Sequence, residues 1–236
     1  RMRKAPTYLL AIIDDHSRLI CHGEFFLSQD LMVYLTVLEK AIRKRGIPDK
    51  IYCDNGKVFL SDQVKRIGMH IGCRIVHTKV RDAAAKGKIE RFFRTVRDQY
   101  LELAVVDKVD TLVELNKRFF KWVEEYNHRK HGSLGCSPME KWLNSSHVPR
   151  LLDDTPLNDD LFLLEDTRLV KKDGTFSLCS KRFETSYIHA GRKVTVRYDR
   201  NDLSRVHVYY ENEYLGLSTP CDPNANNGLP RKGNDL

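Results

Sequence analysis

The chain has 236 residues, 41% of them hydrophobic and 31% charged, which is typical of a soluble globular protein with one large or two small domains. No stretch approaches the run of about 18 apolar residues that a membrane span requires, so the composition argues against an integral membrane protein. The formal net charge is +8 at pH 7, which favours a polyanionic partner, with nucleic acid ahead of an anionic membrane surface.

Targeting and redox features are sparse. Residues 1–15 are basic and then apolar, but the apolar run is short, ends in two acids and lacks a small-residue cleavage site, so we predict a cytoplasmic protein without a signal peptide. The six cysteines are scattered without a CxxC pair and are predicted to be reduced and mostly buried. His70 and Cys73 are spaced closely enough to bind one metal ion, but no second pair accompanies them, so the signal is weak.

The first part of the chain alternates strand patterns with amphipathic helix patterns, which indicates an α/β layered domain. The first two strands are separated by a polar turn and are expected to pair antiparallel. Capping residues and glycines mark the helix ends. In chain order we predict strands over 8–13 and 19–26, a helix over 29–45 capped by Ser28, a strand over 51–53, a helix capped by Ser61 that runs to 70, a strand over 74–77, and helices over 83–106, 111–126 and 138–143.

The later part of the chain changes character. Residues 145–160 have no periodicity and contain prolines and four acids, which is typical of a linker. A period of two residues follows, with strands predicted over 168–171, 175–179, 182–185, 193–198, 205–210 and 213–217; short strands at this spacing indicate a small barrel or sandwich. The predicted domains are an α/β core over 1–144, a linker over 145–160, a small β-barrel over 161–221 and a disordered tail over 222–236.

The helix predicted over 83–106 carries two stripes. The apolar stripe is Ile89, Phe92, Phe93, Val96, Tyr100 and Leu103, and the flanking stripe is Lys86, Glu90, Arg94 and Arg97. One carboxylate among three cations suits an acid that holds a metal ion next to a polyanion. The ordinary alternative is an acid that complements the helix dipole and pairs with Arg94 four residues later.

A second acid, Asp54, follows a predicted strand and opens a loop with Asn55 and Gly56. Functional groups collect beyond the carboxyl ends of strands in open α/β sheets. Asp54 and Glu90 would suit divalent cations, which prefer oxygen ligands, and two such ions about 3.5–4 Å apart promote phosphodiester cleavage. The same residues also fit a type I′ hairpin with Asn-Gly at its turn, so the local sequence leaves both readings open.

The motif DNG with Phe59, followed by KGKIER with 35 residues between the two acids, resembles the D,D(35)E catalytic core of transposases and retroviral-type integrases. Further stretches that fit this resemblance are YLLAIIDDHSRLI (8–20), YNHRKHGSLGCSPMEKW (126–142) and the region 161–220, which is similar to the C-terminal β-barrel of Mu-type transposases. The resemblance implies an RNase H-like core and favours Asp54 as a catalytic residue over the hairpin reading.

The resemblance also implies a function: a DDE polynucleotidyl transferase that carries out DNA transposition and integration. Asp54 and Glu90 would be the catalytic, metal-binding residues for two Mg²⁺ or Mn²⁺ ions. Water would cut a phosphodiester at the element's end, and the liberated 3′-hydroxyl would attack the target strand without a covalent enzyme intermediate. The implied partners are double-stranded DNA, both transposon ends and target, and further copies of the protein on that DNA; no membrane is involved. The implied setting is the bacterial nucleoid.

One departure matters. The family's first catalytic Asp lies on a strand just before the segment that matches 8–13, and this chain has no Asp before Asp14. Asp14 and Asp15 match a later turn, which does not bind metal in the family. We therefore predict that the chain is a fragment that lacks its first strand and first acid, and that it is inactive alone.

Basic residues are the candidates for DNA contact, because phosphate contacts give salt-dependent affinity. The residues predicted to bind DNA are Lys86, Lys88, Arg91, Arg94 and Arg97 on the helix and Arg129 and Lys130 in a later loop. A solvated charged face is the plain alternative. In the barrel region, Lys193, Arg197, Arg200 and Arg205 fit either DNA contact or protection of strand edges. Alternative functions are an RNase H-like nuclease and a non-catalytic, transposase-derived DNA-binding or assembly protein.

Overall fold

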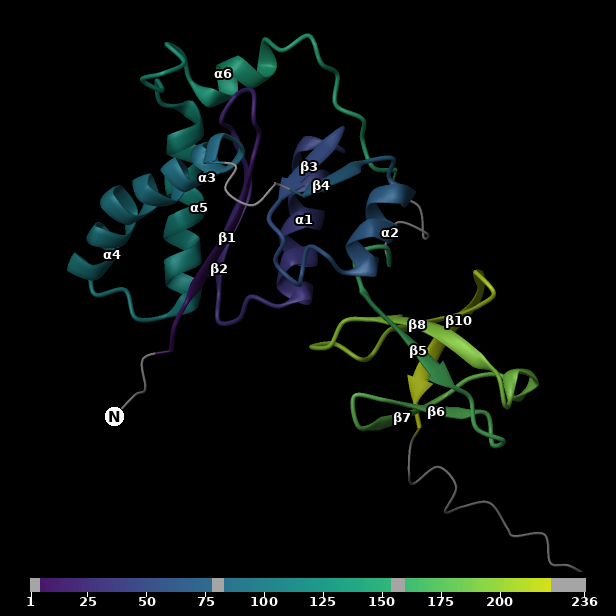
Figure 1. Cartoon of the computed structure of the whole chain (residues 1–236). Coiled ribbons are helices and arrows are strands. Elements are labelled where there is room, and N and C mark those ends of the chain that lie inside the picture. The colour runs from purple at the N-terminus through teal and green to yellow at the C-terminus, as the bar shows by residue number, and fades with distance from the viewer. Residues whose placement is uncertain (1–4, 78–82, 154–159, 222–236) are drawn as a thin grey trace, which may run out of the picture. The chain divides into compact units, whose positions relative to one another are not determined.

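The computed structural model describes residues 5–77, 83–153 and 160–221 (Figure 1). It divides into two compact units, residues 1–162 and 163–236. Unit 1 combines helices with two pairs of strands, and unit 2 is built on a six-stranded sheet. In the described part of the chain, no helix has both the length and the apolar composition that crossing a bilayer requires.

The first two strands of unit 1 are antiparallel, as predicted. β1 (Tyr8–Ile13) pairs with β2 (Ile20–Phe26) along its whole length. The turn between them is held by the carboxylate of Asp14, which accepts hydrogen bonds from the backbone N–H (2.7 Å) and the hydroxyl (2.6 Å) of Ser17. Short polar side chains that bond to nearby backbone favour a turn over continued strand, so the sequence itself ends β1 here.

The second pair of strands is parallel. β3 (Lys50–Cys53) and β4 (Arg74–His77) are connected through α2 (Asp62–His70), because parallel neighbours need a crossover connection. The hairpin alternative for Asn55 and Gly56 is therefore wrong. Within the described residues no strand pairing joins β1–β2 to β3–β4, so they form two separate two-stranded sheets.

The other helices begin at side-chain caps where the sequence offers them. Thr111 and Ser137 each accept a hydrogen bond from the backbone N–H three residues later, as predicted. The predicted cap at Ser28 is wrong: Asp30 accepts from the N–H of Val33 at 3.1 Å, since its carboxylate both bonds the free N–H and complements the helix dipole. These helices are α1 (Leu31–Arg45), α3 (Ala83–Val96), the π-helical segment η1 (Arg97–Leu101), α4 (Glu102–Val106), α5 (Leu112–His128) and α6 (Pro138–Leu143).

The helical stretch over 83–106 forms as predicted, but its apolar stripe does not stay in phase. The π-helical segment η1 adds a residue to one turn, so the next buried position comes one residue later than a regular α-helix would place it. Tyr100 is buried and the next buried position is Ala104, whereas Leu103, predicted to lie in the core, is 61% exposed. A regular period of 3.6 residues therefore locates the core only as far as Tyr100.

The core of unit 1 is an aromatic cluster between β1–β2 and the helices α3 and α5. Phe119 of α5 is fully buried, and its ring centroid lies 4.9 Å from that of Phe25. Gly23 of β2 makes this approach possible, since a Cβ at that position would lie 3.3 Å from the Phe119 ring. Figure 1 shows α5 and α1 on opposite sides of β2, so this strand is covered from both sides.

Two asparagines of α5 fix the helix to the backbone of β2. Asn127 accepts a hydrogen bond from the N–H of Ile20 (2.9 Å) and donates one to its carbonyl (3.1 Å). Asn116 makes the same pair of bonds with Phe25, at 2.8 and 2.9 Å. Each side-chain amide thus takes the place of a neighbouring strand at one end of β2.

Unit 2 is a nearly closed, six-stranded antiparallel barrel, as predicted, with strand order β5-β8-β9-β10-β7-β6. Its elements are β5 (Leu164–Leu169), β6 (Thr175–Leu178), β7 (Lys181–Glu184), the 3₁₀ turn η2 (Tyr187–His189), β8 (Lys193–Tyr198), β9 (Val206–Tyr210) and β10 (Glu213–Pro220). The strand predicted over 168–171 is wrong in its bounds. Two acids near the start of β5 hide the alternation, and Arg197 neutralises one of them, Glu165, at 2.9 Å.

Candidate active site

Asp54 lies directly beyond the carboxyl end of β3, and its side chain is exposed. Its Oδ1 accepts a hydrogen bond from the N–H of Gly56 at 2.8 Å, so the loop holds the carboxylate in place. A Cβ at Gly56 would lie 2.9 Å from this oxygen and 3.3 Å from the ring of Phe59. Phe59 in turn packs edge-on against Tyr34 of α1, with ring centroids 4.8 Å apart. The motif DNG with Phe59 therefore forms a short loop that fixes the Asp54 carboxylate at the end of a strand.

His77 ends β4 beside Asp54. Its Nδ1 lies 3.4 Å from the backbone carbonyl oxygen of Asp54 and 3.5 Å from Sγ of Cys53, its partner in the parallel register. Burial, and then the charge of Asp54, raise the pKa of the Cys53 thiol to about 11, so this thiol is protonated at neutral pH. His77 lies beside Asp54 because β3 and β4 are parallel and end at the same level, with Cys53 paired to His77.

Glu90 lies on α3 and is exposed. Among the described residues its carboxylate has no hydrogen-bond or ion-pair partner, so the predicted pair with Arg94 is absent. The two candidate acids are both open to solvent, and hard oxygen ligands of this kind suit a divalent cation. Together they fall short of a complete site: the described chain contains no cluster of three or more His, Cys, Asp or Glu side chains that would hold a metal ion.

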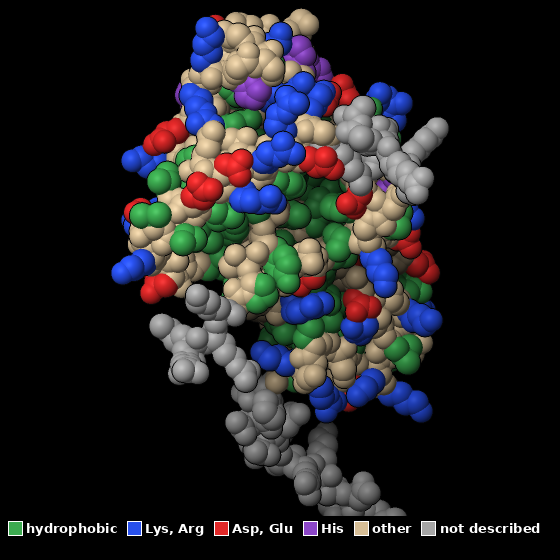
Figure 2. Space-filling view, turned by 60° about the vertical axis from the view of Figure 1, so that its left-hand side comes forward, with side chains coloured by type: hydrophobic (Ala, Val, Ile, Leu, Met, Phe, Trp, Pro, Cys, Tyr) green, Lys and Arg blue, Asp and Glu red, His purple; other side chains and the backbone are tan. Residues whose placement is uncertain are grey.

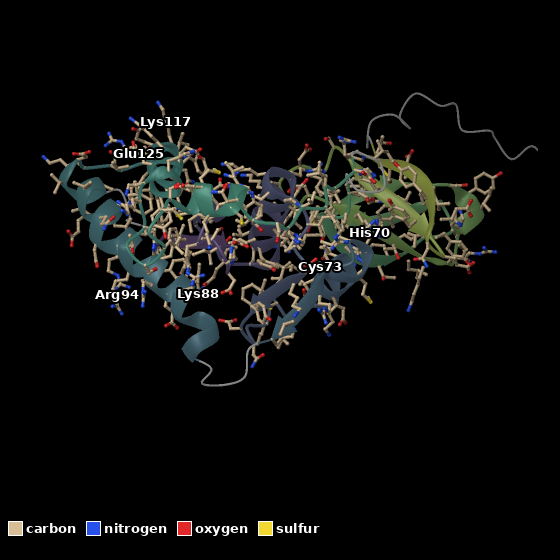
Figure 3. All side chains as sticks on the ribbon, turned by 90° about the horizontal axis from the view of Figure 1, so that it is seen from above. His70, Cys73, Lys88, Arg94, Lys117 and Glu125 are labelled. Atoms are coloured by element: carbon tan, nitrogen blue, oxygen red, sulfur yellow. The ribbon has the colours of Figure 1, made fainter. Side chains whose placement is uncertain are left out.

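The cations predicted to bind DNA differ in their surroundings. Lys88 forms an ion pair: its Nζ lies 2.5 Å from Oδ1 of Asp15, and it also donates a hydrogen bond to the Asp15 backbone carbonyl at 3.1 Å. It therefore joins α3 (Figure 3) to the turn between β1 and β2. Those that are exposed and have no carboxylate partner among the described residues are Arg91, Arg94, Arg97, Arg129 and Lys130; the side chain of Lys86 lies outside the described residues.

The weak metal-binding pair predicted from sequence gains no third ligand within the described chain. His70 ends α2 and Cys73 follows shortly after it (Figure 3). The Cys73 thiol points to the carbonyl oxygen of Arg74 at 3.9 Å, and burial raises its pKa to about 11. A buried, protonated thiol is a small apolar group. The six cysteines are free, as predicted, but the prediction that most are buried is wrong, since only Cys53 and Cys73 are.

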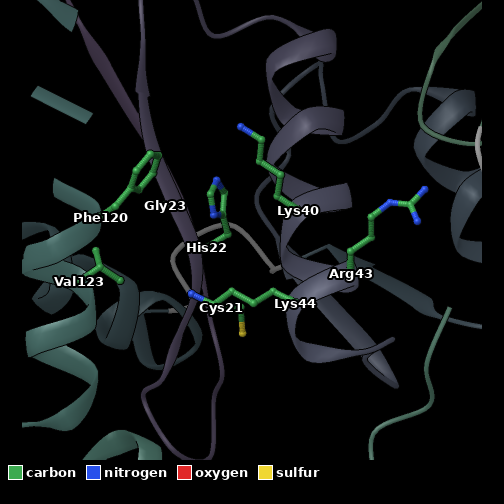
Figure 4. A pocket seen from close by; sticks show the side chains of 8 residues that line it. All are labelled: Cys21, His22, Gly23, Lys40, Arg43, Lys44, Phe120 and Val123. Atoms are coloured by element: carbon green, nitrogen blue, oxygen red, sulfur yellow. The ribbon is translucent and has the colours of Figure 1, made fainter. Parts of the chain in front are cut away.

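A groove of about 590 Å³ lies elsewhere, between β2, α1 and α5 (Figure 4). Neither Asp54 nor Glu90 belongs to its lining, which consists of Cys21, His22, Gly23, Lys40, Arg43, Lys44, Phe120 and Val123. Its lysines are already paired: Lys40 with Glu24 at 2.6 Å and Lys44 with Glu124 at 3.7 Å.

Glu24→Gln is expected to make stability less dependent on acid pH. Burial acts to raise the pKa of Glu24, but hydrogen bonds from His22 (3.1 Å) and Lys40 (2.6 Å) outweigh it and hold the pKa below the usual 4.5. A depressed pKa contributes stability above the unfolded value that is lost as pH falls through the folded value. We expect Gln to cost about 1 kcal/mol at pH 7 and progressively less below pH 4.5, measured by urea unfolding. An equal cost at pH 7 and pH 3 would contradict this.

The fold of unit 1 agrees with the class of fold predicted from the sequence. Unit 1 has the RNase H-like fold of integrase catalytic cores, which confirms the predicted fold class. It places one acid at a strand end and another on a later helix.

Family models match three regions of the chain. The model described as TnsB C-terminal domain matches residues 26–104, which include both Asp54 and Glu90. The integrase core domain matches residues 71–138, and the Mu transposase C-terminal domain matches residues 159–216, in the barrel.

Individual proteins point the same way. The transposase for transposon Tn552 of Staphylococcus aureus is 29% identical over 231 residues, which cover 88% of this chain and 48% of that protein. A putative transposase for insertion sequence element IS5376 of Geobacillus stearothermophilus is 26% identical over 181 residues, covering 72% of this chain and 43% of that protein. The chain thus spans about half the length of these curated relatives.

Among solved structures, the catalytic core domain of BIV integrase matches with a TM-score of 0.50 at 18% identity, over 60% of this chain and 88% of that one. This likeness concerns the fold. Taken with the family models, it confirms the predicted resemblance: an integrase core domain and a Mu transposase C-terminal domain are matched in the two regions where the sequence resembles them.

Proposed function

We propose that the chain belongs to a DDE transposase that cuts DNA at the ends of a mobile element and joins those ends to target DNA, with Asp54 and Glu90 as catalytic residues. The observation that carries the proposal is the state of these two carboxylates. One is held at a strand end by Gly56, both are exposed, and neither forms an ion pair with a described residue. Both lie within one transposase-type match.

Asp54 and Glu90 would hold divalent metal ions, two of Mg²⁺ or Mn²⁺. Bound there, such ions would lower the pKa of water and stabilise the charge on the reacting phosphate. The rest is done by the chain itself. The N–H of Gly56 keeps the Asp54 carboxylate in one orientation, so little rearrangement is needed on binding. The exposed cations of α3 and of the loop after α5 would hold the DNA backbone by its phosphates.

A complete site would contain a third acid, the one that comes first along the chain in the family. We place it on a strand between the two strand pairs. β1 pairs only with β2, and β3 only with β4, in the described part of the chain, so each pair keeps an open edge. Open strand edges are usually covered or paired. In the family that the sequence resembles, the first acid is on the first strand of the core, so we propose that this strand completes the sheet and the site together.

The domain assignment belongs to the same proposal. We assign residues 1–144 to the catalytic core, 145–160 to a linker and 161–221 to the barrel. Arg150, in that linker, donates to the backbone carbonyls of Ile71 (3.2 Å) and Gly72 (3.1 Å), which fixes part of it against unit 1. Double-stranded DNA, as element ends and as target, is the proposed partner. A homo-oligomer is expected because two ends must be joined together.

The test is a strand-transfer assay with labelled element-end DNA. The complete protein is expected to join ends to target in Mg²⁺ or Mn²⁺ and to stop when a chelator is added, because the metal ions activate the reaction. Residues 1–236 alone are expected to bind DNA without cutting or joining it. Cutting without joining by the complete protein would favour a nuclease, and binding without either reaction would favour an assembly protein. Robust metal-dependent joining by residues 1–236 would contradict the assignment of a third acid outside the chain.

A further inference from the structure

Three segments far apart in the sequence converge at one end of unit 1 (Figure 1): the turn between β1 and β2, the first half of α3, and the loop after α5. Asn127, near the end of α5, bonds both backbone groups of Ile20. Lys88 of α3 forms its ion pair with Asp15 in the turn. An arginine follows or precedes each linked residue by two or three positions: Arg18 in the turn, Arg91 on α3 and Arg129 after α5.

Arg129 is held over aromatic rings. Its guanidinium carbon lies 5.3 Å from the ring centroid of Tyr126 and 5.8 Å from that of Trp122. Its Nη2 donates to the side-chain oxygen of Gln99 at 2.6 Å. The ring of His131 meets Tyr126 edge-on, with centroids 6.3 Å apart. The guanidinium is thus positioned by rings and a neutral amide, and its charge is not neutralised.

Arg18 has an unsatisfied donor. Its backbone has φ = 65°, in the left-handed region, within the β1–β2 turn. Its Nη1 is buried and has no hydrogen-bond partner among the described residues. Leaving a buried donor of a charged group unpaired costs about 1–3 kcal/mol or more, so the charge of Arg18 is poorly compensated by the turn that carries it.

The three guanidiniums share one neighbour. After burial, the charges of Arg18, Arg91 and Arg129 lower the pKa of His131, so this imidazole is neutral at pH 7 and adds no further charge. Arg129 and Arg18 likewise act to lower the pKa of Tyr126, although burial raises it overall. Arg18 and Arg129 thus lie near enough to influence both rings, and Arg91 lies near enough to influence His131.

No acid balances the cluster. Within the described chain none of the three arginines has a carboxylate at ion-pair distance, and the acids of the adjacent turn are engaged, Asp14 by Ser17 and Asp15 by Lys88. Figure 2 shows Lys, Arg and His side chains gathered at the top of the molecule, at the height where Figure 1 places α6. Like charges held together without a counter-ion repel, which an anionic ligand would relieve.

We propose that Arg18, Arg91 and Arg129 form one binding site for a phosphate group of the DNA backbone, beside His131. The planar fork of a guanidinium matches phosphate oxygens, and the three come from separate rigid segments. This site rests on the proposed function for its ligand, DNA. It differs from a general basic face because the contacts Asn127–Ile20 and Lys88–Asp15 hold the three segments together, and no described carboxylate pairs with any of the three arginines.

The test measures binding of the 236-residue chain to a fluorescent DNA duplex over a salt series. Arg18→Gln and Arg129→Gln are each expected to weaken binding about tenfold at low salt, since one charge-assisted hydrogen bond is lost. The double variant should weaken it by less than the product of the two, because both residues hold one phosphate. Arg192→Gln is the matched control, because Arg192 is an exposed arginine of unit 2 that also lies over an aromatic ring, that of Tyr210; it should change affinity about twofold at most.

The melting temperature separates this site from a structural role. Removing one of three uncompensated charges should leave the melting temperature of Arg18→Gln equal to or above that of the unaltered chain. Inorganic phosphate should raise the melting temperature of the unaltered chain but not of the variant. A lower melting temperature with unchanged DNA affinity would overturn the proposal, and so would fully multiplicative effects. None of these outcomes bears on the role of Asp54 and Glu90. The strand-transfer assay tests that role, and with it the proposed function, separately.

Discussion

Asp54→Asn and Glu90→Gln are each expected to reduce strand transfer by the complete protein at least about a thousandfold. Each change removes a negative charge that would hold a metal ion at the reacting phosphate. Since each 1.36 kcal/mol of activation free energy is tenfold in rate, a loss of about 4 kcal/mol gives this factor. The measurement is the initial rate of end joining in Mg²⁺, with the complete protein and its element-end DNA.

The fold should survive both changes. Asn at position 54 still offers an oxygen to the N–H of Gly56, and Glu90 has no described partner to lose. DNA affinity and melting temperature are therefore expected to stay at the values of the unaltered protein. Asp62→Asn is the matched control, because Asp62 is an acid of the same unit with a side chain 98% exposed, and it forms an ion pair with Lys65 at the start of α2. A variant at 54 or 90 that joins ends at the normal rate would show that the site is assigned to the wrong residues.

The readings of Asp54 show where local sequence stops being informative. An Asn-Gly pair between apolar residues fits a hairpin as well as a strand end. The structure excludes the hairpin through a non-local property: Ile51 of β3 pairs in parallel with Ile75 of β4, and α2 connects the two strands along the chain. Hydrophobic alternation gave the existence of both strands, but pairing between segments more than twenty residues apart cannot be derived from the local pattern of either one.

The helix over 83–106 shows a second limit. Its existence and its buried positions up to Tyr100 follow from periodicity. The π-helical segment that moves the next buried position to Ala104 depends on how the helix packs against α5, where the hydroxyl of Tyr100 donates to the carbonyl oxygen of Leu115. Such a contact leaves no signature in the spacing of apolar residues.

Charged and amide residues show a third limit. Lys88 and Arg91 are equivalent cations in the sequence, yet the first is spent on an ion pair with Asp15 and the second has no described partner. Nothing in the local sequence distinguishes Arg18 or Asn127, because the first lies in a polar turn and the second lies just beyond the helix predicted over 111–126. Their importance comes from backbone groups and charges that only tertiary packing brings near.

Asn127→Ala is expected to be strongly destabilising, by about 3 kcal/mol, because it leaves the N–H and the carbonyl of Ile20 without partners where water cannot reach them. Asn127 and Ile20 are both fully buried. For a unit of this size the loss corresponds to about 6–12 °C in melting temperature. The measurement is urea unfolding of the 236-residue chain at pH 7, followed by a probe of helix content.

Asn116→Ala is the matched comparison, since Asn116 bonds Phe25 with the same geometry from the other end of α5. Asn116 is only half-buried, so water can replace its amide, and the expected cost is about 1 kcal/mol. The difference in unfolding free energy between the two variants then measures how much burial strengthens the hydrogen bonds between an asparagine side chain and the β2 backbone. Equal costs would mean that the cost comes from loss of the amide itself and not from burial.

Since Asn127 also links the β1–β2 turn to the loop that carries Arg129, its loss should weaken DNA binding as well, whereas Asn116→Ala should leave DNA binding unchanged.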